Sequence, residues 1–301
     1  MQPIGRTTGK NPKNRFQSTH TVIDPAVLQE RVRTEYFSDA TRSALVRNQS
    51  PDIPFEFGLN PYRGCEHGCI YCYARPTHEY LDLSSGLDFE SKIIVKKELP
   101  ELLANELRRK SWKPQVIALS GNTDCNQPSE RRFRITRKCL EVLLEYRNPV
   151  SIITKNHLIL QDLDILREMA AYNLVHVNLS ITTLKQELSE KMEPRASAPN
   201  KRLACLRSLA DAQIPVGIIL APLIPGLNHE EMDSILRLPI QYSQEPADPR
   251  FLSPPDPFRP KSPTPLRGVT WIESVQQPSP FTASSTRSAP SSESLSHPLT
   301  N

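Results

Sequence analysis

Three cysteines lie within eight residues in the first quarter of the chain: Cys65, Cys69 and Cys72, with the spacing C-x3-C-x2-C. Thiolates bind soft metal centres, and three at this spacing can reach one centre without help from distant sequence. Gly64 and Gly68 allow the loop to turn back on itself, because glycine accepts backbone conformations that other residues avoid. The loop holds no fourth cysteine. We therefore expect a metal centre held by three sulfur ligands.

The lack of a fourth cysteine in this loop favours a chemically active centre. A closed structural metal site uses four protein ligands, whereas a catalytic site keeps one position open. On a four-iron cluster, three thiolates would leave one iron free for a substrate or cosubstrate. The alternatives are a zinc site made of the three cysteines and His67, or cysteines that serve only as core residues. Disulfides fit less well, because the loop itself holds an odd number of cysteines and we expect no secretion signal.

Composition indicates a chain that is only partly packed. The 301 residues are 38% hydrophobic, include 29 prolines and carry a net charge of +4. The longest nearly apolar run, 214–226, is too short and too rich in proline to span a bilayer. We expect a cytoplasmic protein with no membrane partner. The first 50 residues hold eight basic and four acidic residues, so this arm is either a nucleic-acid contact or a solvated leader.

Short apolar segments alternate with amphipathic segments between residues 93 and 236. This alternation predicts buried strands separated by helices, and therefore a parallel sheet covered by helices. Strands are expected at 93–95, 116–119, 150–153, 175–179 and 216–220. Helices are expected near 25–34, 99–110, 135–146, 163–169 and 201–212, and after a capping box formed by Asn228 and Glu231.

Polar residues follow these strands directly. In a parallel barrel the ligand lies at the carboxyl ends of the strands, so polar residues at those positions are expected to line one mouth. The residues concerned are Ser120, Thr123, Asp124, Lys155, Ser180 and Thr182. The alternative is a chance clustering, since loops are polar in any case.

The cysteine loop, NPYRGCEHGCIYCY from Asn60 to Tyr73, resembles that of the radical S-adenosylmethionine (SAM) superfamily. Together with the flanking stretch from Ser50 to Lys96, it is similar to a bacterial group labelled as DNA repair photolyases, which resembles spore photoproduct lyase. The resemblance extends from about Asn14 to Leu236. It implies an α/β fold, a partial (β/α)6 barrel of the TIM type.

The segment after Leu236 breaks the alternation and has no resemblance to this group. Residues 239–301 contain 13 prolines, many serines and no sustained apolar period, which predicts a disordered tail. Members of the group continue here with a sixth strand, so we expect this barrel to lack its last strand; a frameshift near Arg237 would explain it. The expected domains are a basic arm (1–50), a barrel (51–237) and a tail (238–301).

The resemblance implies a role for each candidate residue. Cys65, Cys69 and Cys72 would hold a [4Fe-4S] cluster, with SAM on the fourth iron, and reductive cleavage would give a 5'-deoxyadenosyl radical. The Gly-Gly-Glu run that often contacts the SAM amino group in this superfamily is absent. The implied SAM contacts are Tyr71 at the adenine, Thr123 with Ser120 and Asp124 at the amino group, Lys155 at the carboxylate, Ser180 on the other side, and Arg195 at the ribose or substrate.

One departure concerns the substrate. Spore photoproduct lyase returns a hydrogen atom from a cysteine just before its Ser/Thr-Asp pair, where this chain has Gly121 and Asn122. Cys125 is the nearby candidate for a hydrogen donor, while Cys139 and Cys205 fit core positions on helices. We expect a radical SAM enzyme with an unassigned substrate, either nucleic acid or another compound, and a reductant such as flavodoxin or ferredoxin. The alternative is a cluster-bearing nucleic-acid-binding or regulatory protein without turnover.

Overall fold

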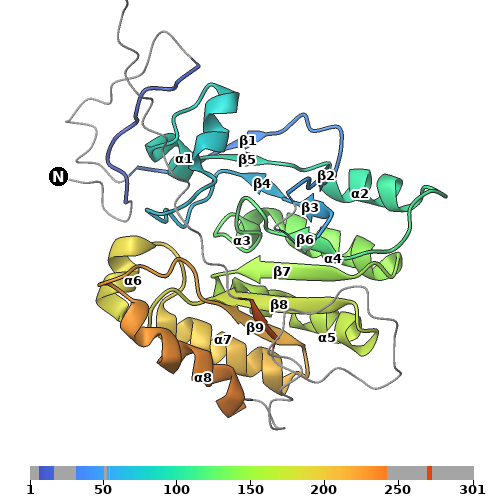
Figure 1. Ribbon diagram of the computed structural model, residues 1–301. Coiled ribbons are helices and arrows are strands. Elements are labelled where there is room, and N and C mark those ends of the chain that lie inside the picture. The colour runs from blue at the N-terminus through green and yellow to red at the C-terminus, as the bar shows by residue number, and fades with distance from the viewer. Residues whose placement is uncertain (1–6, 17–31, 51–52, 54, 243–269, 273–301) are drawn as a thin grey trace, which may run out of the picture.

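A seven-stranded, mostly parallel sheet forms the centre of the computed structural model, which describes residues 7–16, 32–50, 53, 55–242 and 270–272 (Figure 1). The strand order is β10-β9-β8-β7-β6-β3-β2. Every neighbouring pair is parallel except β2 with β3, which is antiparallel. The strands are β2 (Leu45–Arg47), β3 (Phe57–Leu59), β6 (Ile117–Leu119), β7 (Val150–Thr154), β8 (Val175–Ser180), β9 (Val216–Ile219) and β10 (Thr270–Ile272).

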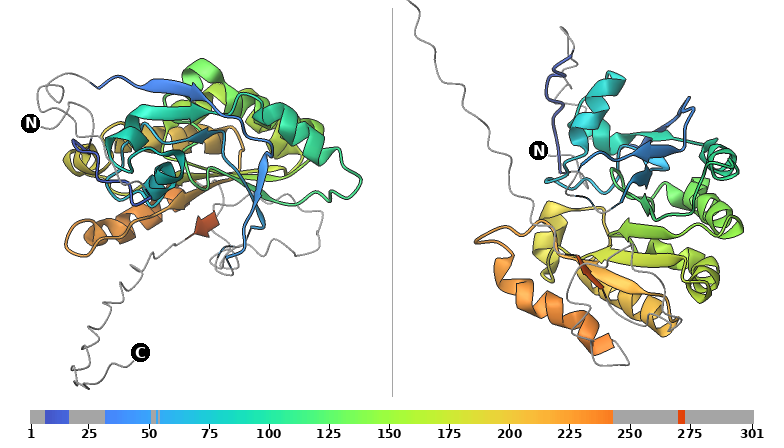
Figure 2. Two further views of the ribbon diagram at one scale, coloured as in Figure 1. Left: turned by 90° about the horizontal axis from the view of Figure 1, so that it is seen from above. Right: turned by 45° about the vertical axis from the view of Figure 1, so that its right-hand side comes forward.

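Helices connect these strands and pack beside one another along the outside of the curved sheet (Figure 2). They are α2 (Leu99–Leu107), α3 (Glu130–Phe133), α4 (Ile135–Glu145), α5 (Leu163–Ala171), α6 (Gln186–Met192), α7 (Pro199–Asp211) and α8 (Met232–Tyr242). Strands β6 and β9 are buried along their whole length, as expected for a parallel sheet with both faces covered. None of the described helices combines the length and apolar character needed to cross a bilayer.

A second, three-stranded sheet lies beside the barrel and has the order β1-β5-β4. Its strands are β1 (Glu35–Ser38), β4 (Tyr62–Arg63) and β5 (Lys92–Val95), and the short helix α1 (Leu87–Ser91) precedes β5. The strand expected at 93–95 is therefore present, but it belongs to this sheet and not to the barrel. Residues 35–38 and 45–47, within the expected basic arm, contribute one strand to each sheet.

The predicted α/β barrel is confirmed, and the strands and helices expected between residues 93 and 236 are present with small shifts at their ends. The sequence did not predict β3, which has only three residues between two prolines, Pro54 and Pro61. This strand is defined by its partners, β2 on one side and β6 on the other. Pairing partners distant in sequence leave no local periodicity, so such a strand is not visible in the pattern.

The expectation that the barrel lacks its last strand is wrong in one respect. Thr270–Ile272 form β10 and pair in parallel with Gly217–Ile219 of β9, which gives the barrel six parallel strands. The three residues are β-branched or aromatic, types that favour strands, but the proline-rich surroundings hid them. The rest of the predicted tail, 243–269 and 273–301, and most of the helix predicted at 25–34 lie outside the described residues.

The predicted capping box at Asn228 is also wrong. The Asn228 side chain donates to the carbonyl oxygens of Thr182 (2.8 Å) and Pro222 (2.9 Å) and makes no capping bond. The Glu231 carboxylate accepts from the Thr183 hydroxyl (2.7 Å) and the Leu184 amide (2.7 Å). Both side chains therefore attach the start of α8 to the end of β8. A 3-10 turn and not an α-helix begins at His229.

Candidate metal centre and cosubstrate site

The three cysteines lie on the loop between β4 and the 3-10 segment Arg75–Leu81. All three are free thiols; Cys65 and Cys69 are buried and Cys72 is half-buried. Burial raises the pKa of each thiol, that of Cys69 to about 12, and the charges of Asp124 and the other two cysteines raise that of Cys65 further. Thiolates at these positions therefore require a positively charged centre.

Two glycines of the loop have backbone conformations that other residues rarely adopt. The φ angle is +78° at Gly64 and +67° at Gly68. A Cβ added at Gly64 would lie 2.8 Å from Cε1 of His78 and 2.9 Å from the carbonyl oxygen of Phe89. The loop thus depends on glycine at this position for both its conformation and its packing.

We expect Gly64→Ala to lower the free energy of unfolding by about 1–3 kcal/mol, because it forces a strained φ and a clash with buried atoms. Urea unfolding of the apoprotein measures this change. Gly121→Ala is the matched control, since a Cβ at Gly121 would meet nothing within 4 Å. Equal stabilities of the two variants would contradict this account of the loop.

Two side chains that the sequence analysis missed, the buried Gln127 and the half-buried Arg75, satisfy the backbone of the loop. Gln127 accepts from the Glu66 amide (2.9 Å) and donates to the Gly64 carbonyl oxygen (3.1 Å). Arg75 donates to the carbonyl oxygen of Cys69 (2.8 Å) and forms an ion pair with the buried Glu90 (2.5 Å). These bonds fix the path of the loop between the barrel on one side and α1 on the other.

His67 does not join the cysteines. Its ring is fully buried; Nε2 lies 3.2 Å from Nδ2 of Asn156 and Nδ1 lies 3.4 Å from Oδ2 of Asp124. Nε2 therefore faces Asn156, and Nδ1, although it has no hydrogen-bond partner, faces Asp124; this disfavours the zinc site with His67 as fourth ligand. No three His, Cys, Asp or Glu side chains in the described ranges lie close enough to share one metal ion. In a four-iron cluster each cysteine binds a different iron, so the thiols need not meet at one point.

Asp124 joins the ends of β6 and β7. Its carboxylate accepts from the Thr154 hydroxyl (2.7 Å), the Asn126 amide (2.9 Å) and the Lys155 amide (2.8 Å). These bonds, with His67 beside them, occupy both carboxylate oxygens. The contribution of Asp124 is therefore to hold the main chain at Lys155 in place.

Ser120 and Thr123 lie at the end of β6 with their hydroxyl protons engaged. Ser120 donates to the carbonyl oxygen of Thr123 (2.7 Å), and Thr123 donates to that of Tyr62 (2.9 Å). A hydroxyl that donates in this way presents its lone pairs to other donors. Since the Ser120 oxygen already accepts from the Cys125 amide (2.6 Å), Thr123 is the better acceptor for an ammonium group.

Lys155 connects the cysteine loop to the end of β8. Its ammonium donates to the hydroxyls of Tyr71 (3.1 Å) and Ser180 (3.3 Å). The Tyr71 hydroxyl also lies 3.1 Å from that of Thr182 and donates to Glu193. Burial lowers the pKa of Lys155, but its neighbours Tyr71, Cys69 and Glu193 raise it by more, so the group stays charged. A fixed ammonium therefore stands beside the cysteine loop.

A fully buried ion pair supports this lysine, and the sequence analysis missed it. Glu193 follows α6 and binds Arg202 of α7, and its other oxygen lies 3.6 Å from Nζ of Lys155. Arg202 also donates to the carbonyl oxygens of Ser197 (2.6 Å) and Ser180 (2.9 Å). Burial raises the pKa of Glu193, but Lys155 and Arg202 lower it by more, so the carboxylate is charged.

Two predicted residues lie apart from this group of side chains. Arg195 donates to Glu66 of the cysteine loop (3.0 Å), an acidic residue that also accepts from Thr34 (2.8 Å). The Cys125 thiol is fully buried in the main core, where burial raises its pKa well above the usual value. The structure therefore offers Cys125 no route to a substrate at the mouth of the barrel.

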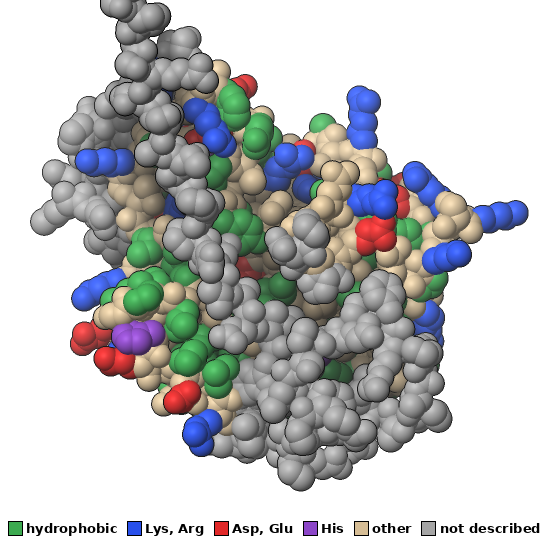
Figure 3. All heavy atoms as spheres, in the orientation of Figure 1, with side chains coloured by type: hydrophobic (Ala, Val, Ile, Leu, Met, Phe, Trp, Pro, Cys, Tyr) green, Lys and Arg blue, Asp and Glu red, His purple; other side chains and the backbone are tan. Residues whose placement is uncertain are grey.

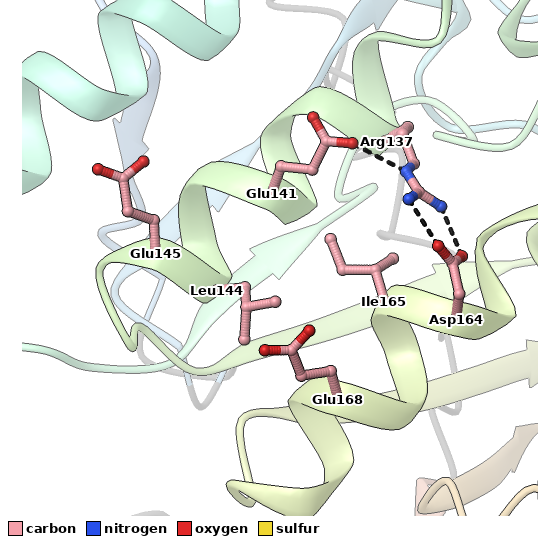
Figure 4. A pocket seen from close by; sticks show the side chains of 7 residues that line it. All are labelled: Arg137, Glu141, Leu144, Glu145, Asp164, Ile165 and Glu168. Carbon is pink, nitrogen blue, oxygen red and sulfur yellow. Dashed lines mark hydrogen bonds and ion pairs between the residues drawn. The ribbon is translucent and has the colours of Figure 1, made fainter.

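A separate surface pocket lies between α4 and α5, on the outer layer of helices (Figure 4). Arg137 crosses it and pairs with Glu141 (2.9 Å) and Asp164 (2.6 Å). The pocket is otherwise lined by Leu144, Glu145, Ile165 and Glu168. It contains none of the strand-end residues and is not continuous with the cysteine loop.

Comparison with known proteins places these residues in a family context. A model of the radical SAM superfamily matches residues 59–238, which include the cysteine loop and the strand-end residues. An uncharacterised protein of Mycobacterium bovis is 37% identical over 220 residues, covering 69% of this chain and 64% of the relative. An uncharacterised protein of Methanocaldococcus jannaschii is 30% identical over 172 residues, covering 57% of this chain and 62% of the relative. The chain thus matches less than two thirds of either relative.

Solved structures of spore photoproduct lyase share the fold. A mutant of this lyase superposes with a TM-score of 0.54 at 18% identity, over 70% of this chain and 58% of the other. Another mutant, with bound AdoMet and dinucleoside spore photoproduct, superposes with a TM-score of 0.52 at 18% identity, over 69% of this chain and 57% of the other.

Proposed function

Because the chain belongs to the radical SAM superfamily, we propose that it holds a [4Fe-4S] cluster on Cys65, Cys69 and Cys72 and cleaves SAM reductively. The family implies both cofactors, and the donor set fits them: three free thiols on one loop, with no fourth cysteine in that loop and with the ring of His67 directed at Asn156 and Asp124. When bound, cluster and SAM supply a 5'-deoxyadenosyl radical that removes a hydrogen atom from a substrate.

The observation that carries this proposal is the bond from Lys155 at the end of β7 to Tyr71 between the second and third cysteines. It brings a charged ammonium from the mouth of the barrel to the loop that would hold the cluster. A protein that merely carried a cluster would have no need for such a group. The contact therefore supports an enzyme over the non-catalytic alternative.

The chain's own residues have defined parts in this proposal. Lys155 binds the SAM carboxylate, with Ser180 holding the ammonium from the other side, and Thr123 accepts from the SAM amino group. Tyr71 lies at the adenine. Asp124 positions the main chain of Lys155 and does not contact SAM, which departs from the role that the family resemblance gave it.

The substrate class belongs to this proposal as well. One structural neighbour is bound to dinucleoside spore photoproduct, which suggests a nucleic-acid substrate. The buried thiol of Cys125 and the residues Gly121 and Asn122 argue against return of a hydrogen atom from a cysteine. We therefore propose a nucleic-acid substrate other than spore photoproduct.

Anaerobic reconstitution with iron and sulfide, followed by dithionite and SAM, tests the activity. We expect 5'-deoxyadenosine and methionine to form. Cys69→Ala should abolish product formation, while Cys205→Ala, which changes a buried cysteine of α7, should retain it. A reconstituted cluster that yields no 5'-deoxyadenosine would instead support a non-catalytic iron-sulfur protein.

A further inference from the structure

Residues 7–16, here called the N-terminal strap, run beside α1 and the 3-10 segment Arg75–Leu81, away from the strands of the barrel (Figures 1 and 2). The Thr7 hydroxyl donates to the carbonyl oxygen of Gly68, which lies between the first and second cysteines of the loop. Arg75, which binds the carbonyl oxygen of Cys69, also donates to Thr7 (3.4 Å). The strap therefore contacts the backbone that would carry the cluster.

Asparagine side chains attach the strap to the elements that follow the third cysteine. The side-chain amide of Asn11 donates to the Asp88 carboxylate (3.0 Å), and the backbone amide of Asp88 donates to the side-chain oxygen of Asn11 (3.0 Å). Asn14 is buried and donates to the carbonyl oxygens of Glu79 (3.0 Å) and Leu83 (3.2 Å). These bonds hold the strap as an ordered layer against α1 and the 3-10 segment that follows the cysteine loop.

The outer surface of the strap is basic and partly aromatic. Lys10, Lys13 and Arg15 are exposed, and Arg15 lies over the ring of Phe16 at 5.1 Å. Phe16 packs on Tyr80 with ring centroids 5.2 Å apart, although the two residues are 57% and 70% exposed. Figure 3 shows lysine and arginine side chains at this end of the molecule.

Acidic residues near the strap are already paired or too few to neutralise it. Glu79 binds Arg15 (2.6 Å), and Asp88 binds Lys92 (3.2 Å) as well as Asn11. Asp82, at the end of the 3-10 segment, is exposed. The two lysines therefore leave a net positive surface on the strap, which reaches the cysteine loop at Thr7.

We propose that the outer surface of the strap is the docking site for a small acidic protein that carries one electron. The inference rests on the proposed function, because reductive cleavage of SAM consumes one electron. The strap touches the cysteine loop at Gly68, so a carrier docked on its outer surface would lie close to the loop that would hold the cluster. The carrier is oxidised by one electron, and the C–S bond of SAM is broken to methionine and the deoxyadenosyl radical. Exposed aromatic rings among cations are typical of contact surfaces for such partners.

The test compares two electron sources in one pair of variants. Lys10→Glu/Lys13→Glu reverses the charge of the strap, and Lys110→Glu/Lys113→Glu makes the same change on exposed residues between α2 and β6, at the other end of the strands. With reduced flavodoxin, an acidic carrier, we expect the strap variant to form 5'-deoxyadenosine with a kcat/KM for flavodoxin about tenfold lower at low salt. High salt should reduce the difference. With dithionite, both variants should match the parent protein.

Three outcomes would overturn the proposal. Equal flavodoxin kinetics in the parent and both variants would do so while leaving the SAM chemistry intact, as would a parent that accepts electrons from dithionite but not from flavodoxin. If the strap variant loses affinity for a labelled oligonucleotide but uses flavodoxin normally, the surface contacts nucleic acid instead. A parent that makes no 5'-deoxyadenosine with dithionite would refute the proposed function itself.

Discussion

Lys155→Met is expected to raise the dissociation constant for SAM by at least about 30-fold while leaving the iron content of the reconstituted protein unchanged. The ammonium is held by Tyr71 and Ser180 in a partly buried setting, and loss of one member of such a charged contact costs about 2–5 kcal/mol. The three thiols that would bind iron are not altered. Equilibrium binding of SAM to the anaerobically reconstituted protein, beside iron analysis, measures both quantities.

The control for this variant is Lys201→Met, which removes an exposed lysine from the first turn of α7. Its affinity for SAM should equal that of the parent protein. If Lys155→Met binds SAM as tightly as Lys201→Met does, Lys155 does not contact the cosubstrate. If it loses iron as well as SAM, Lys155 supports the cysteine loop and has no separate binding role.

Glu193→Ala is expected to lower the free energy of unfolding by about 3–5 kcal/mol. It leaves the guanidinium of Arg202, which is fully buried, without its carboxylate partner. Urea unfolding of the apoprotein measures the loss. Glu190→Ala, on the exposed side of α6, is the matched control and should change stability by less than about 0.5 kcal/mol.

A double variant separates the effect of this ion pair on stability from its effect on the position of Lys155. Glu193→Gln/Arg202→Met removes both buried charges, so we expect it to recover much of the stability lost in Glu193→Ala. We expect its affinity for SAM to stay below that of the parent, because Lys155 has lost the carboxylate 3.6 Å away. Full recovery of both stability and affinity would show that the ion pair has no part in holding Lys155.

The sequence predicted much of the fold because hydrophobic periodicity is a local signal. The alternation of strands and helices between Val116 and Ile219 follows from the burial of both faces of a parallel sheet, and the structure confirms it. The strands β3 and β10 were missed because each has three residues and is defined by distant pairing partners. The capping box at Asn228 failed because its side chain has stronger tertiary partners at the end of β8.

The residues of the candidate site also divide into those that the sequence predicted and those that it missed. The rule that ligands lie at the carboxyl ends of parallel strands places Lys155 beside Ser180, and the structure has these groups in contact. Glu193, Arg202 and Gln127 were missed because they come from helices and loops, where nothing in the local sequence marks a buried polar residue. Their partners become visible only once the strands bring distant segments together.

The most direct test of the account is electron-nuclear double resonance on the reduced, reconstituted protein with labelled SAM bound. The SAM carries 15N at its amino group and 17O at its carboxylate. Three cysteines that leave one iron open predict hyperfine coupling from both labels to the cluster, as expected for direct binding through the amino and carboxylate groups. A reduced four-iron cluster that shows no coupling from either label, or a centre that contains zinc in place of iron, would contradict it.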